Sequence, residues 1–379
     1  MGDGSALTIV NEQLAELGGA ERLVAALRER FPRALLMGPR FDTTNLPGDI
    51  PAEWSDPVRL VGAGGRRNQF LAPLHAHRMA REAPLDGLVL TIGNNSWAHA
   101  VRIAPGARHV AMAHGPPRCL YGHSSRYLSV QPGVLRPVLR AALPLLRSEY
   151  RRRLRPPHRR IAISRWSAGR LERIHGLPWE IVNPPVRSDF FTPGPDGRRA
   201  SGPLLVSSRI VRHKYLDLLI EAVRGLDVEL VVVGSGPAIE ELRAMAPPNV
   251  RFTGWVEDEE LRELYRSASL FVTAAPEEFG IALSEAQASG VPVIAPAQGG
   301  AAEIVRPGVT GELLPEVTPA ALRGAIVAAR ARPWDSGACR DAALRFTPER
   351  FVAAVESVLV EEAAKLRSVP EPAAQAAYA

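Results

Sequence analysis

The chain has little cysteine and no long apolar run, and each shortage excludes a class of protein. Only two of its 379 residues are cysteines, Cys119 and Cys339. They fall in different predicted domains, which argues against a disulfide framework or a cysteine metal site and favours a reducing compartment. No apolar run approaches a bilayer span, and the first residues lack the basic and apolar regions of a signal peptide. We therefore expect a cytoplasmic protein, soluble or peripheral at the inner face of the membrane.

Lysine is also scarce. Arginine outnumbers lysine 44 to 2, and the two lysines are Lys214 and Lys365. A planar guanidinium does not replace a compact ammonium without consequence. A lysine kept in so arginine-rich a chain therefore favours a specific task for Lys214, although a solvated lysine at the start of a surface helix fits the same observation.

Strand-like apolar runs alternate with amphipathic helices along both halves of the chain, which is typical of doubly wound α/β domains. The length exceeds one ordinary core. We predict two Rossmann-like domains facing a cleft, 1–186 and 187–347, with Pro- and Gly-rich turn chemistry near 184–203, a last helix at 348–367 and a tail at 368–379. The apolar runs are Leu7–Val10, Val58–Val61, Leu88–Ile92, Val110–Ala113 and Ile161–Ile163, then Leu204–Val206, Glu229–Val233, Val250–Thr253, Leu270–Thr273 and Val291–Ala295.

The most informative segment runs from Glu277 to Val305. Seven residues separate Glu277 from Glu285, and Phe279-Gly280 between them indicates a loop that turns into a helix. Free N–H groups at a helix start suit a diphosphate, and a carboxylate just before it can accept hydrogen bonds from sugar hydroxyls. The pattern favours a sugar-nucleotide site with one acid on the sugar and the other on the ribose, although an ordinary acidic helix start has the same spacing.

This segment resembles the acid-x7-acid signature of the family 4 retaining glycosyltransferases, which have the two-domain GT-B fold. Four further matches in the family's order span nearly the whole chain, and together they make a chance match improbable. They are Leu17–Arg22, similar to an N-terminal glycine loop; Ala162–Arg165 with Asn183–Val186, similar to an interdomain approach; Ser208–Lys214 with Leu218–Ala222, similar to a phosphate-gripping segment; and Leu230–Pro237 with Val250–Val256, similar to nucleotide-side strands.

The resemblance implies metal-independent transfer of a sugar from a nucleoside diphosphate to an acceptor hydroxyl, with retention and without a further cofactor. In this interpretation Arg209 and Lys214 neutralise the leaving diphosphate. Glu277 orients the sugar and Glu285 the ribose. The sequence also contains no Asp-x-Asp pair, the metal-binding signature of the other large glycosyltransferase fold. The resemblance further places Gly18, Gly19, Gly234, Phe279, Gly280 and Ile281 at the donor, and packs the last helix on the first domain. Gly299, Gly300 and Glu303 follow the next strand and are expected to line the nucleotide pocket, although a Gly-Gly pair is also typical of a turn before a short helix.

His114 follows the apolar run Val110–Ala113 directly, and ligands of α/β sheets bind beyond the carboxyl ends of strands. It resembles a cleft histidine that contacts the donor sugar or the acceptor, although a capping or core histidine has the same placement. The run from His114 to Arg118 is similar to the His-Thr-Pro-Pro-Arg of a mannosyltransferase-like branch, which favours GDP-mannose. The chain departs from the family pattern at Gly115, Ser208 and Glu278.

The first domain is rich in positive charge. Between Val101 and Arg187 there are 17 arginines and three acids, which implies an anionic partner. Apolar residues recur at helical spacing from Leu135 to Leu154, with arginines nearby. This pattern is typical of a helix that lies on an anionic bilayer, where each basic side chain contributes about 1 kcal/mol to membrane binding. A domain helix with an arginine-rich solvent side fits equally well, and Pro137 and Pro144 argue against a single straight helix.

Three alternatives remain beside the transferase. A sugar-nucleotide epimerase of the same fold would need no acceptor. A non-catalytic nucleic-acid or membrane binder would use the basic first domain, but no nucleic-acid motif is present, so we expect no nucleic-acid partner. A dehydrogenase is the third alternative, but Gly234-Ser235-Gly236 is only an incomplete match to the three-glycine fingerprint of dinucleotide-binding proteins. The sequence leaves open the donor base and sugar, the oligomeric state, and an acceptor that is a glycan, a glycolipid or a lipid-linked saccharide.

Overall fold

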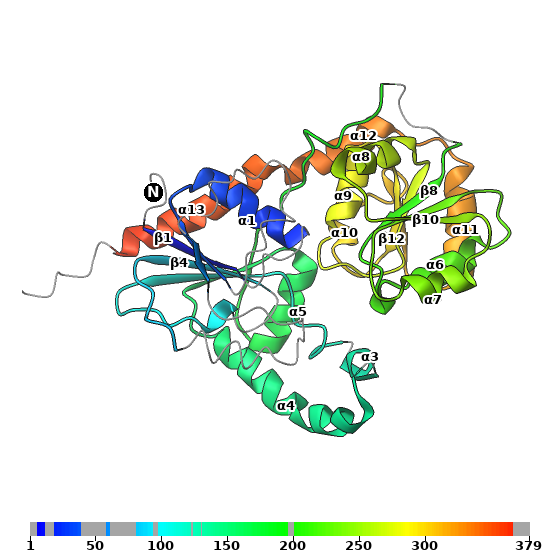
Figure 1. Cartoon of the computed structure of the whole chain (residues 1–379). Helices are drawn as coiled ribbons and strands as arrows, with labels where there is room; N and C mark the ends of the chain where they lie inside the picture. Colours follow the sequence, from blue (N-terminus) through cyan, green and yellow to red (C-terminus); the bar gives the residue numbers. More distant parts are fainter. Residues whose placement is uncertain are drawn as a thin grey trace, which may run out of the picture. The chain divides into compact units, whose positions relative to one another are not determined.

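The computed structural model describes residues 6–11, 19–38, 58–60, 81–93, 98–122, 124–129, 131–195 and 201–366, and the structural statements below concern these residues. They form two compact units (Figure 1). The first unit comprises the residues up to Ala162, Arg170–Val182 and the residues from Val352, and the second comprises Ile163–Gly169 and Asn183–Phe351. The sequence had assigned 163–169 and 183–186 to the first domain, whereas their contacts place them in the second unit.

The first unit is built on a seven-stranded parallel sheet with the order β3-β2-β1-β4-β5-β6-β7. Every residue of the central strand β4 is buried, as expected for a parallel strand covered on both faces. The five predicted runs of this half are confirmed as strands, and two short strands, β2 and β7, were not predicted. The strands are β1 Leu7–Asn11, β2 Leu35–Gly38, β3 Val58–Leu60, β4 Leu88–Gly93, β5 Arg108–Ala113, β6 Arg159–Ala162 and β7 Glu180–Ile181.

The second unit has a six-stranded parallel sheet with the order β10-β9-β8-β11-β12-β13. The predicted doubly wound α/β class is therefore confirmed for both units, because each sheet grows in one direction from its first strand and then in the other. The unpredicted strand here is β13. The strands are β8 Leu204–Ser207, β9 Leu230–Val233, β10 Val250–Gly254, β11 Leu270–Val272, β12 Val293–Pro296 and β13 Gly311–Leu314.

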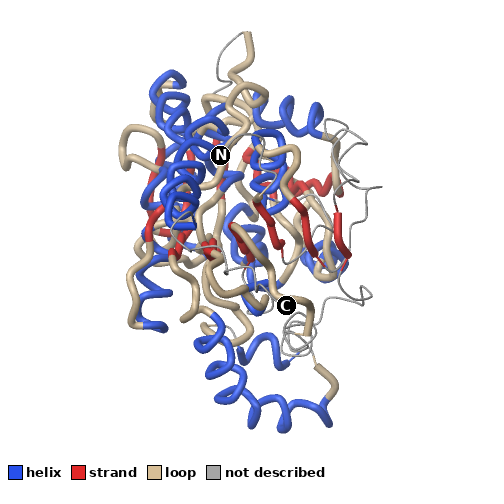
Figure 2. Tube along the Cα trace, turned by 90° about the vertical axis from the view of Figure 1, so that its left-hand side faces the viewer, coloured by secondary structure: helices blue, strands red, loops and turns tan. Residues whose placement is uncertain are grey.

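Helices cover both faces of each sheet (Figures 1 and 2). In the second unit, α6 packs against α11 on one face, where Leu219, Ile220 and Leu322 join one apolar core, and α9 packs against α12 on the other. The helices are α1 Gly19–Arg30, α3 Ser124–Ser129, α4 Arg136–Arg153, α5 Arg165–His175, α6 Leu216–Val223, α7 Ile239–Met245, α8 Asp258–Ser267, α9 Ile281–Ala288, α10 Ala301–Ile304, α11 Pro319–Arg330, α12 Ser336–Ala343 and α13 Pro348–Leu366, with 3-10 turns η4 Ala98–Ala100, η5 Gly133–Leu135, η6 Arg212–Lys214 and η7 Leu344–Phe346.

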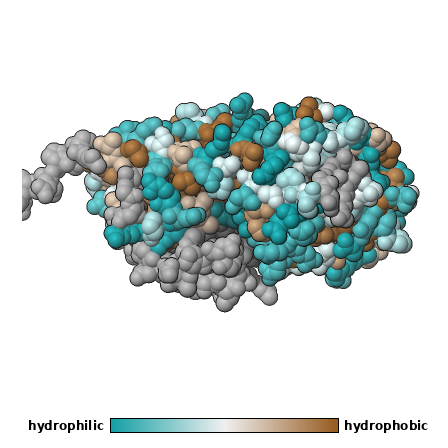
Figure 3. Space-filling view, turned by 90° about the horizontal axis from the view of Figure 1, so that it is seen from above, coloured by the Kyte–Doolittle hydropathy of each residue, from teal (hydrophilic) through white to brown (hydrophobic). Residues whose placement is uncertain are grey.

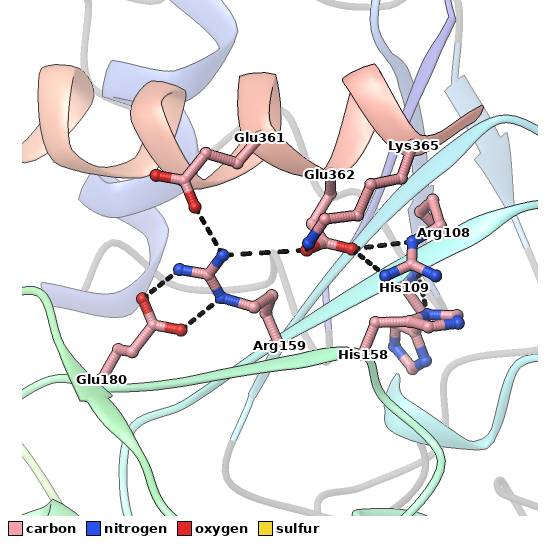
Figure 4. Close-up of polar contacts among 8 residues, drawn as sticks. All are labelled: Arg108, His109, His158, Arg159, Glu180, Glu361, Glu362 and Lys365. Carbon is pink, nitrogen blue, oxygen red and sulfur yellow. Dashed lines mark hydrogen bonds and ion pairs between the residues drawn. The ribbon is translucent and has the colours of Figure 1, made fainter. Parts of the chain in front are cut away.

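The residues of α13 from Val352 onward belong to the first unit, where a network of charges holds them against the sheet (Figure 4). The carboxylate of Glu362 is fully buried and accepts hydrogen bonds from Arg108 of β5 (2.7 Å) and Lys365 (2.5 Å). Arg159 of β6 contacts Glu361 at 2.6 Å. Burial alone would raise the pKa of Glu362, but the hydrogen bonds from Lys365 and Arg108 outweigh it and lower that pKa.

The surface is mostly polar on the face seen in Figure 3, where hydrophobic residues occur in small separate groups. None of the helices in the described part of the chain is both long enough and apolar enough to cross a membrane.

Candidate functional site

The residues predicted to bind the diphosphate follow two adjacent strands in the middle of the second sheet. Arg209 and Lys214 come after β8, and Glu277 comes after β11. These two strands are neighbours, and the order of the sheet reverses between them. In open α/β sheets the crevice at such a reversal, beyond the carboxyl ends of the strands, is where ligands bind. The fold therefore gathers these side chains at the expected edge of the sheet.

Lys214 and Glu277 form an ion pair at this edge. Both side chains are largely buried, with exposures of 14% and 18%. The ammonium is carried on η6, and the next residue, Tyr215, is left-handed (φ 53°), the only non-glycine residue with positive φ in the described ranges. Such a conformation costs about 1–3 kcal/mol and persists only where the surrounding structure imposes it. The turn that aims Lys214 is thus held by its packing, and Tyr215 packs against the apolar core of this unit.

Gly234 lets the loop after β9 approach the loop that carries Arg209. A Cβ at Gly234 would lie 2.0 Å from the Ser208 carbonyl oxygen. The N–H of Ile210 donates to the Ser235 carbonyl at 2.8 Å and ties the two loops together. Arg209 itself is exposed. The role that the structure shows for Gly234 is close backbone packing, and its contact with a donor stays a prediction.

The loop from Glu277 to Gly280 is fixed from two sides. The N–H of Gly300 donates to the Glu277 carbonyl at 2.9 Å, and a Cβ at Gly300 would lie 2.2 Å from the Phe279 carbonyl oxygen. From the other side, the hydroxyl of Ser164 donates to the Glu278 carbonyl. Gly280 then starts α9 with φ 114°, a conformation that favours glycine. Ile281 follows as the first helical residue, as predicted.

Two predicted donor-binding side chains are buried. Phe279 packs edge-on against Phe346 with ring centroids 5.0 Å apart, so its side chain anchors the loop in the interior of the unit. Glu285 is 5% exposed, and its Oε2 accepts a hydrogen bond from the Tyr265 hydroxyl at 3.2 Å. The ribose-binding role of Glu285 stays a prediction. Tyr265 was missed because no local pattern on α8 indicates which carboxylate its hydroxyl will contact.

Two further residues belong to the second unit, Glu303, whose role in the nucleotide pocket stays a prediction, and Trp255, which the sequence did not single out. Glu303, expected in the nucleotide pocket, accepts a hydrogen bond from the Trp166 N–H at 3.2 Å, and burial raises the pKa of its carboxyl. Trp255 follows β10 directly and is 61% exposed. The Gly254 carbonyl before it accepts a hydrogen bond from the Gly234 N–H at 2.7 Å. An exposed aromatic at the carboxyl edge of a sheet was the signal that could have identified Trp255.

His114 belongs to the first unit, where it follows β5. Its N–H donates to the Gly93 carbonyl at 3.4 Å, and its buried Nε2 has no hydrogen-bond partner among the described residues. Burial lowers its pKa to about 4, so the ring is neutral at pH 7. The neutral imidazole of His114, with its unused nitrogen, can donate or accept one hydrogen bond with a ligand.

Of the predicted glycine pair, Gly19 is the first residue of α1, and Gly18 lies outside the described residues.

Within the described ranges no three or more His, Cys, Asp and Glu side chains are grouped so that they could hold a metal ion.

Comparisons with known proteins agree with this geometry. Residues 201–331 match the family model of the glycosyl transferases group 1. A GDP-mannose-dependent alpha-mannosyltransferase of Corynebacterium glutamicum is 43% identical over 107 residues, which are 28% of this chain and 26% of that protein. A D-inositol 3-phosphate glycosyltransferase of Geodermatophilus obscurus is 36% identical over 234 residues, 52% of each chain. The matches thus span between about a quarter and a half of these relatives.

Solved structures extend the likeness to both units. The structure of Anabaena HepE in complex with UDP and glucose is 18% identical and superposes with a TM-score of 0.68, covering 94% of this chain and 99% of that one. At this identity the likeness concerns the fold. Within the second unit, residues 201–331 are thus similar to the glycosyl transferases group 1, and the chain has the two-domain GT-B fold that the resemblance in its sequence predicted.

Proposed function

We propose that the protein is a retaining glycosyltransferase that moves a sugar from a nucleoside diphosphate to an acceptor hydroxyl. The observation that carries this proposal is the Lys214–Glu277 ion pair at the carboxyl edge of the second sheet, next to the helix start at Gly280. Mannose from GDP-mannose is the first candidate donor, supported by the name of the Corynebacterium relative. The acceptor is a glycan, a glycolipid or a lipid-linked saccharide.

The chemistry follows from the charges at this edge. When the bond between the anomeric carbon and the diphosphate breaks, negative charge develops on the leaving oxygen. The ammonium of Lys214 and the first N–H groups of α9 stabilise that charge, with Arg209 as a second cation. These groups take the place of a divalent cation, so the transfer is metal-independent. The acceptor oxygen bonds to the same face of the anomeric carbon, and its proton passes to the departing phosphate.

Glu277 has two tasks in this proposal. Without donor, its carboxylate compensates the ammonium of Lys214. When the donor binds, the phosphate pairs with the ammonium, and the carboxylate accepts hydrogen bonds from sugar hydroxyls. With and without donor, each of the two charged groups thereby has a polar partner in a largely buried place, where a charge without a partner is costly.

Transfer and donor hydrolysis would be measured with GDP-mannose, GDP-glucose, UDP-glucose and UDP-N-acetylglucosamine, with and without EDTA. We expect one donor to bind and to be hydrolysed slowly, with activity unchanged by EDTA. The anomeric configuration of the product, read by NMR, tests retention. Conversion of the donor to an isomer without an acceptor would favour an epimerase, and failure to bind any of the donors would refute the proposal.

We also propose that α4 attaches the protein to an anionic membrane surface. This helix has two apolar sides, because Leu143 and Tyr150 are buried in the unit while Val138 and Leu145 point to solvent. Val134 before the helix is 82% exposed and Leu145 is 71% exposed. The helix lies at the periphery of its unit, away from the sheet (Figures 1 and 2).

A positive charge on this outer side complements an anionic bilayer. Arg152 is exposed seven residues after Leu145, on the same side of the helix, and a basic side chain contributes about 1 kcal/mol of attraction near a surface of anionic lipids. Co-sedimentation with phosphatidylglycerol vesicles should be lost in a Val138→Gln, Leu145→Gln variant and kept in Val327→Gln, which changes an exposed valine of α11 in the other unit. Equal sedimentation of both variants would refute this attachment.

A further inference from the structure

A pocket of about 330 Å³ lies in the first unit between α4, α5 and the segment that follows β5. None of its lining residues is a predicted site residue. Its polar lining consists of Tyr121 and three arginines, Arg147, Arg170 and Arg173, and Gly122 forms part of its edge. None of its lining residues is acidic. A concave site with three guanidinium groups and no carboxylate favours an anionic ligand.

Two of the arginines are oriented by backbone carbonyls. The Nε of Arg147 donates to the Leu120 carbonyl at 2.9 Å, and its guanidinium lies 5.7 Å from the centroid of the Tyr121 ring. Nη2 of Arg170 contacts the Tyr121 carbonyl at 3.4 Å. A guanidinium has five N–H donors in a planar fork, so the contact with the Leu120 carbonyl sets the orientation of Arg147 and uses one of its donors.

The remaining groups complete the site. Arg173 is exposed on α5. It follows Arg170 by three residues and therefore lies on the same face of the helix. Gly122 has φ +98°, a backbone conformation that favours glycine, and it lies beside the guanidinium of Arg170, since a Cβ there would be 3.7 Å from Nη2. The nearby carboxylate of Glu149 is engaged by Arg152 (2.7 Å) and Arg153 (2.6 Å).

Tyr121 supplies a neutral donor. Burial raises the pKa of its hydroxyl, although Arg151 and Arg147 act in the opposite direction. The phenol therefore keeps its proton at neutral pH. It contacts the Arg147 carbonyl at 3.4 Å, a long hydrogen bond that a stronger acceptor can replace.

We infer that this pocket binds a phosphate group carried by the acceptor. Arginine forks match the oxygens of a phosphate with paired hydrogen bonds, and a phenol adds a further donor. The phosphate is either that of a soluble phosphate ester or that of a lipid headgroup, since both present the same oxygens. That the phosphate belongs to an acceptor rests on the proposed transferase function, whereas phosphate binding itself does not.

The test is calorimetric titration of the full chain with inorganic phosphate and with glycerol 3-phosphate. We expect Arg173→Gln to weaken both affinities by about tenfold or more, because each hydrogen bond to a charged group contributes about 1.5–3 kcal/mol. Arg140→Gln is the matched control, since it removes the same charge from an exposed site on α4 that does not line the pocket. Lys214→Ala, which disables the proposed donor site, should leave the binding in this pocket unchanged.

Vesicles distinguish the two sources of phosphate. If Arg173→Gln weakens binding to phosphatidylglycerol vesicles and Arg140→Gln does not, the ligand is a headgroup phosphate. If Arg173→Gln weakens binding of the soluble phosphate probes alone, the ligand is a soluble ester. The inference is overturned if the full chain binds neither phosphate probe, or if Arg173→Gln and Arg140→Gln weaken binding equally. Loss of donor binding with phosphate binding intact would count against the transferase proposal alone.

Discussion

Lys214 and Glu277 form an ion pair in the second unit although 63 positions separate them in the chain. The sequence contains one other lysine, Lys365, and it pairs with Glu362 in the first unit. Each lysine therefore compensates a glutamate in its own unit. Only Lys214 stands at the carboxyl edge of a sheet, where ligands of this fold class bind.

Replacing Lys214 by alanine should lower kcat by about 10²- to 10³-fold, because the charge on the leaving diphosphate loses its nearest cation. Lys365→Ala is the matched control and should keep kcat. Rates would be measured with saturating donor for both variants. Because the two partners act as a unit, Lys214→Ala, Glu277→Gln should lose much less than the product of the single effects. Fully multiplicative losses would show that the pair is not coupled in the reaction.

Gly300→Ala should abolish donor binding by displacing the loop that holds Glu277. The new Cβ would lie 2.2 Å from the Phe279 carbonyl oxygen, a contact that backbone cannot relieve without moving. Gly324→Ala on α11 is the control, since nothing lies within 4 Å of its new Cβ. In a helix interior that change should stabilise the protein by up to about 1 kcal/mol. Retained donor affinity in Gly300→Ala would mean that the loop is not the donor site.

Trp255→Ala should weaken donor binding by about 1–3 kcal/mol, the usual contribution of one base stacked on an aromatic ring. The expected signature is a raised KM for the donor with little change in kcat, because stacking on the base is equal in the ground and transition states. Trp255→Phe should recover most of the affinity. A lowered kcat with an unchanged KM would instead implicate this side chain in the chemical step.

The first unit should lose stability in acid. Burial lowers the pKa of His99 and His109 to about 3, and that of His114 and His175 to about 4. Unfolded histidine has a pKa of about 6.5. Above pH 6.5 the folded and unfolded chains bind equal numbers of protons at these sites, so the stability is fully present. As pH falls from 6.5 towards 3–4, the unfolded chain takes up protons that the folded chain rejects.

Each of these histidines should therefore remove up to about 1.4 kcal/mol per pH unit in that window. Urea unfolding at pH 7, 6, 5 and 4 would measure the slope. His175→Asn should reduce it by the share of one histidine, even if the variant is less stable at pH 7 because the ring packs between Tyr150 and Trp179. An unchanged slope would assign the acid sensitivity to other groups.

Glu362→Ala should destabilise the first unit by about 3–5 kcal/mol, because Arg108 would be left without its buried partner. The adjacent Glu361→Ala should cost less than about 1 kcal/mol, since Glu361 is mostly exposed. Both values would come from urea unfolding at pH 7. If the two variants were equally stable, the buried network of Figure 4 would not be what holds α13.

The sequence predicted the central strands because they are continuous apolar runs, buried on both faces of a parallel sheet. It missed β2, β7 and β13, which have two to four residues each and depend on pairing with a neighbour. Pro137 and Pro144 were expected to complicate a single straight helix, and α4 runs through both without a break. Pro137 lies in the first turn, where no N–H is needed, and Pro144 lies on the exposed side, where water can bind the carbonyl left without a partner.

Site prediction had a similar limit. Loop-to-helix junctions and glycine pairs identified Lys214, Glu277 and Gly280 individually. Their pairing depends on which strands are neighbours, and the orientation of Phe279 towards Phe346 depends on an element 67 positions later in the chain. Neither relation leaves a local signal. The pocket formed by Tyr121 and its arginines was likewise not predicted. The sequence shows that arginines are in excess, but not which of them lie together in the fold.

The assignment of the residues from Val352 to the first unit has a consequence for how the protein is made. A ribosome releases the strands of this unit early, yet Arg108 and Arg159 meet the carboxylates of α13 only after the whole second unit has been synthesised. Until then the nascent first unit has an uncovered surface, and Arg108 lacks its buried partner Glu362, whereas Arg159 can already pair with Glu180. During translation it should be the part of the protein that binds chaperones and is cut by proteases, and a message truncated after the second unit should yield a product that cells degrade.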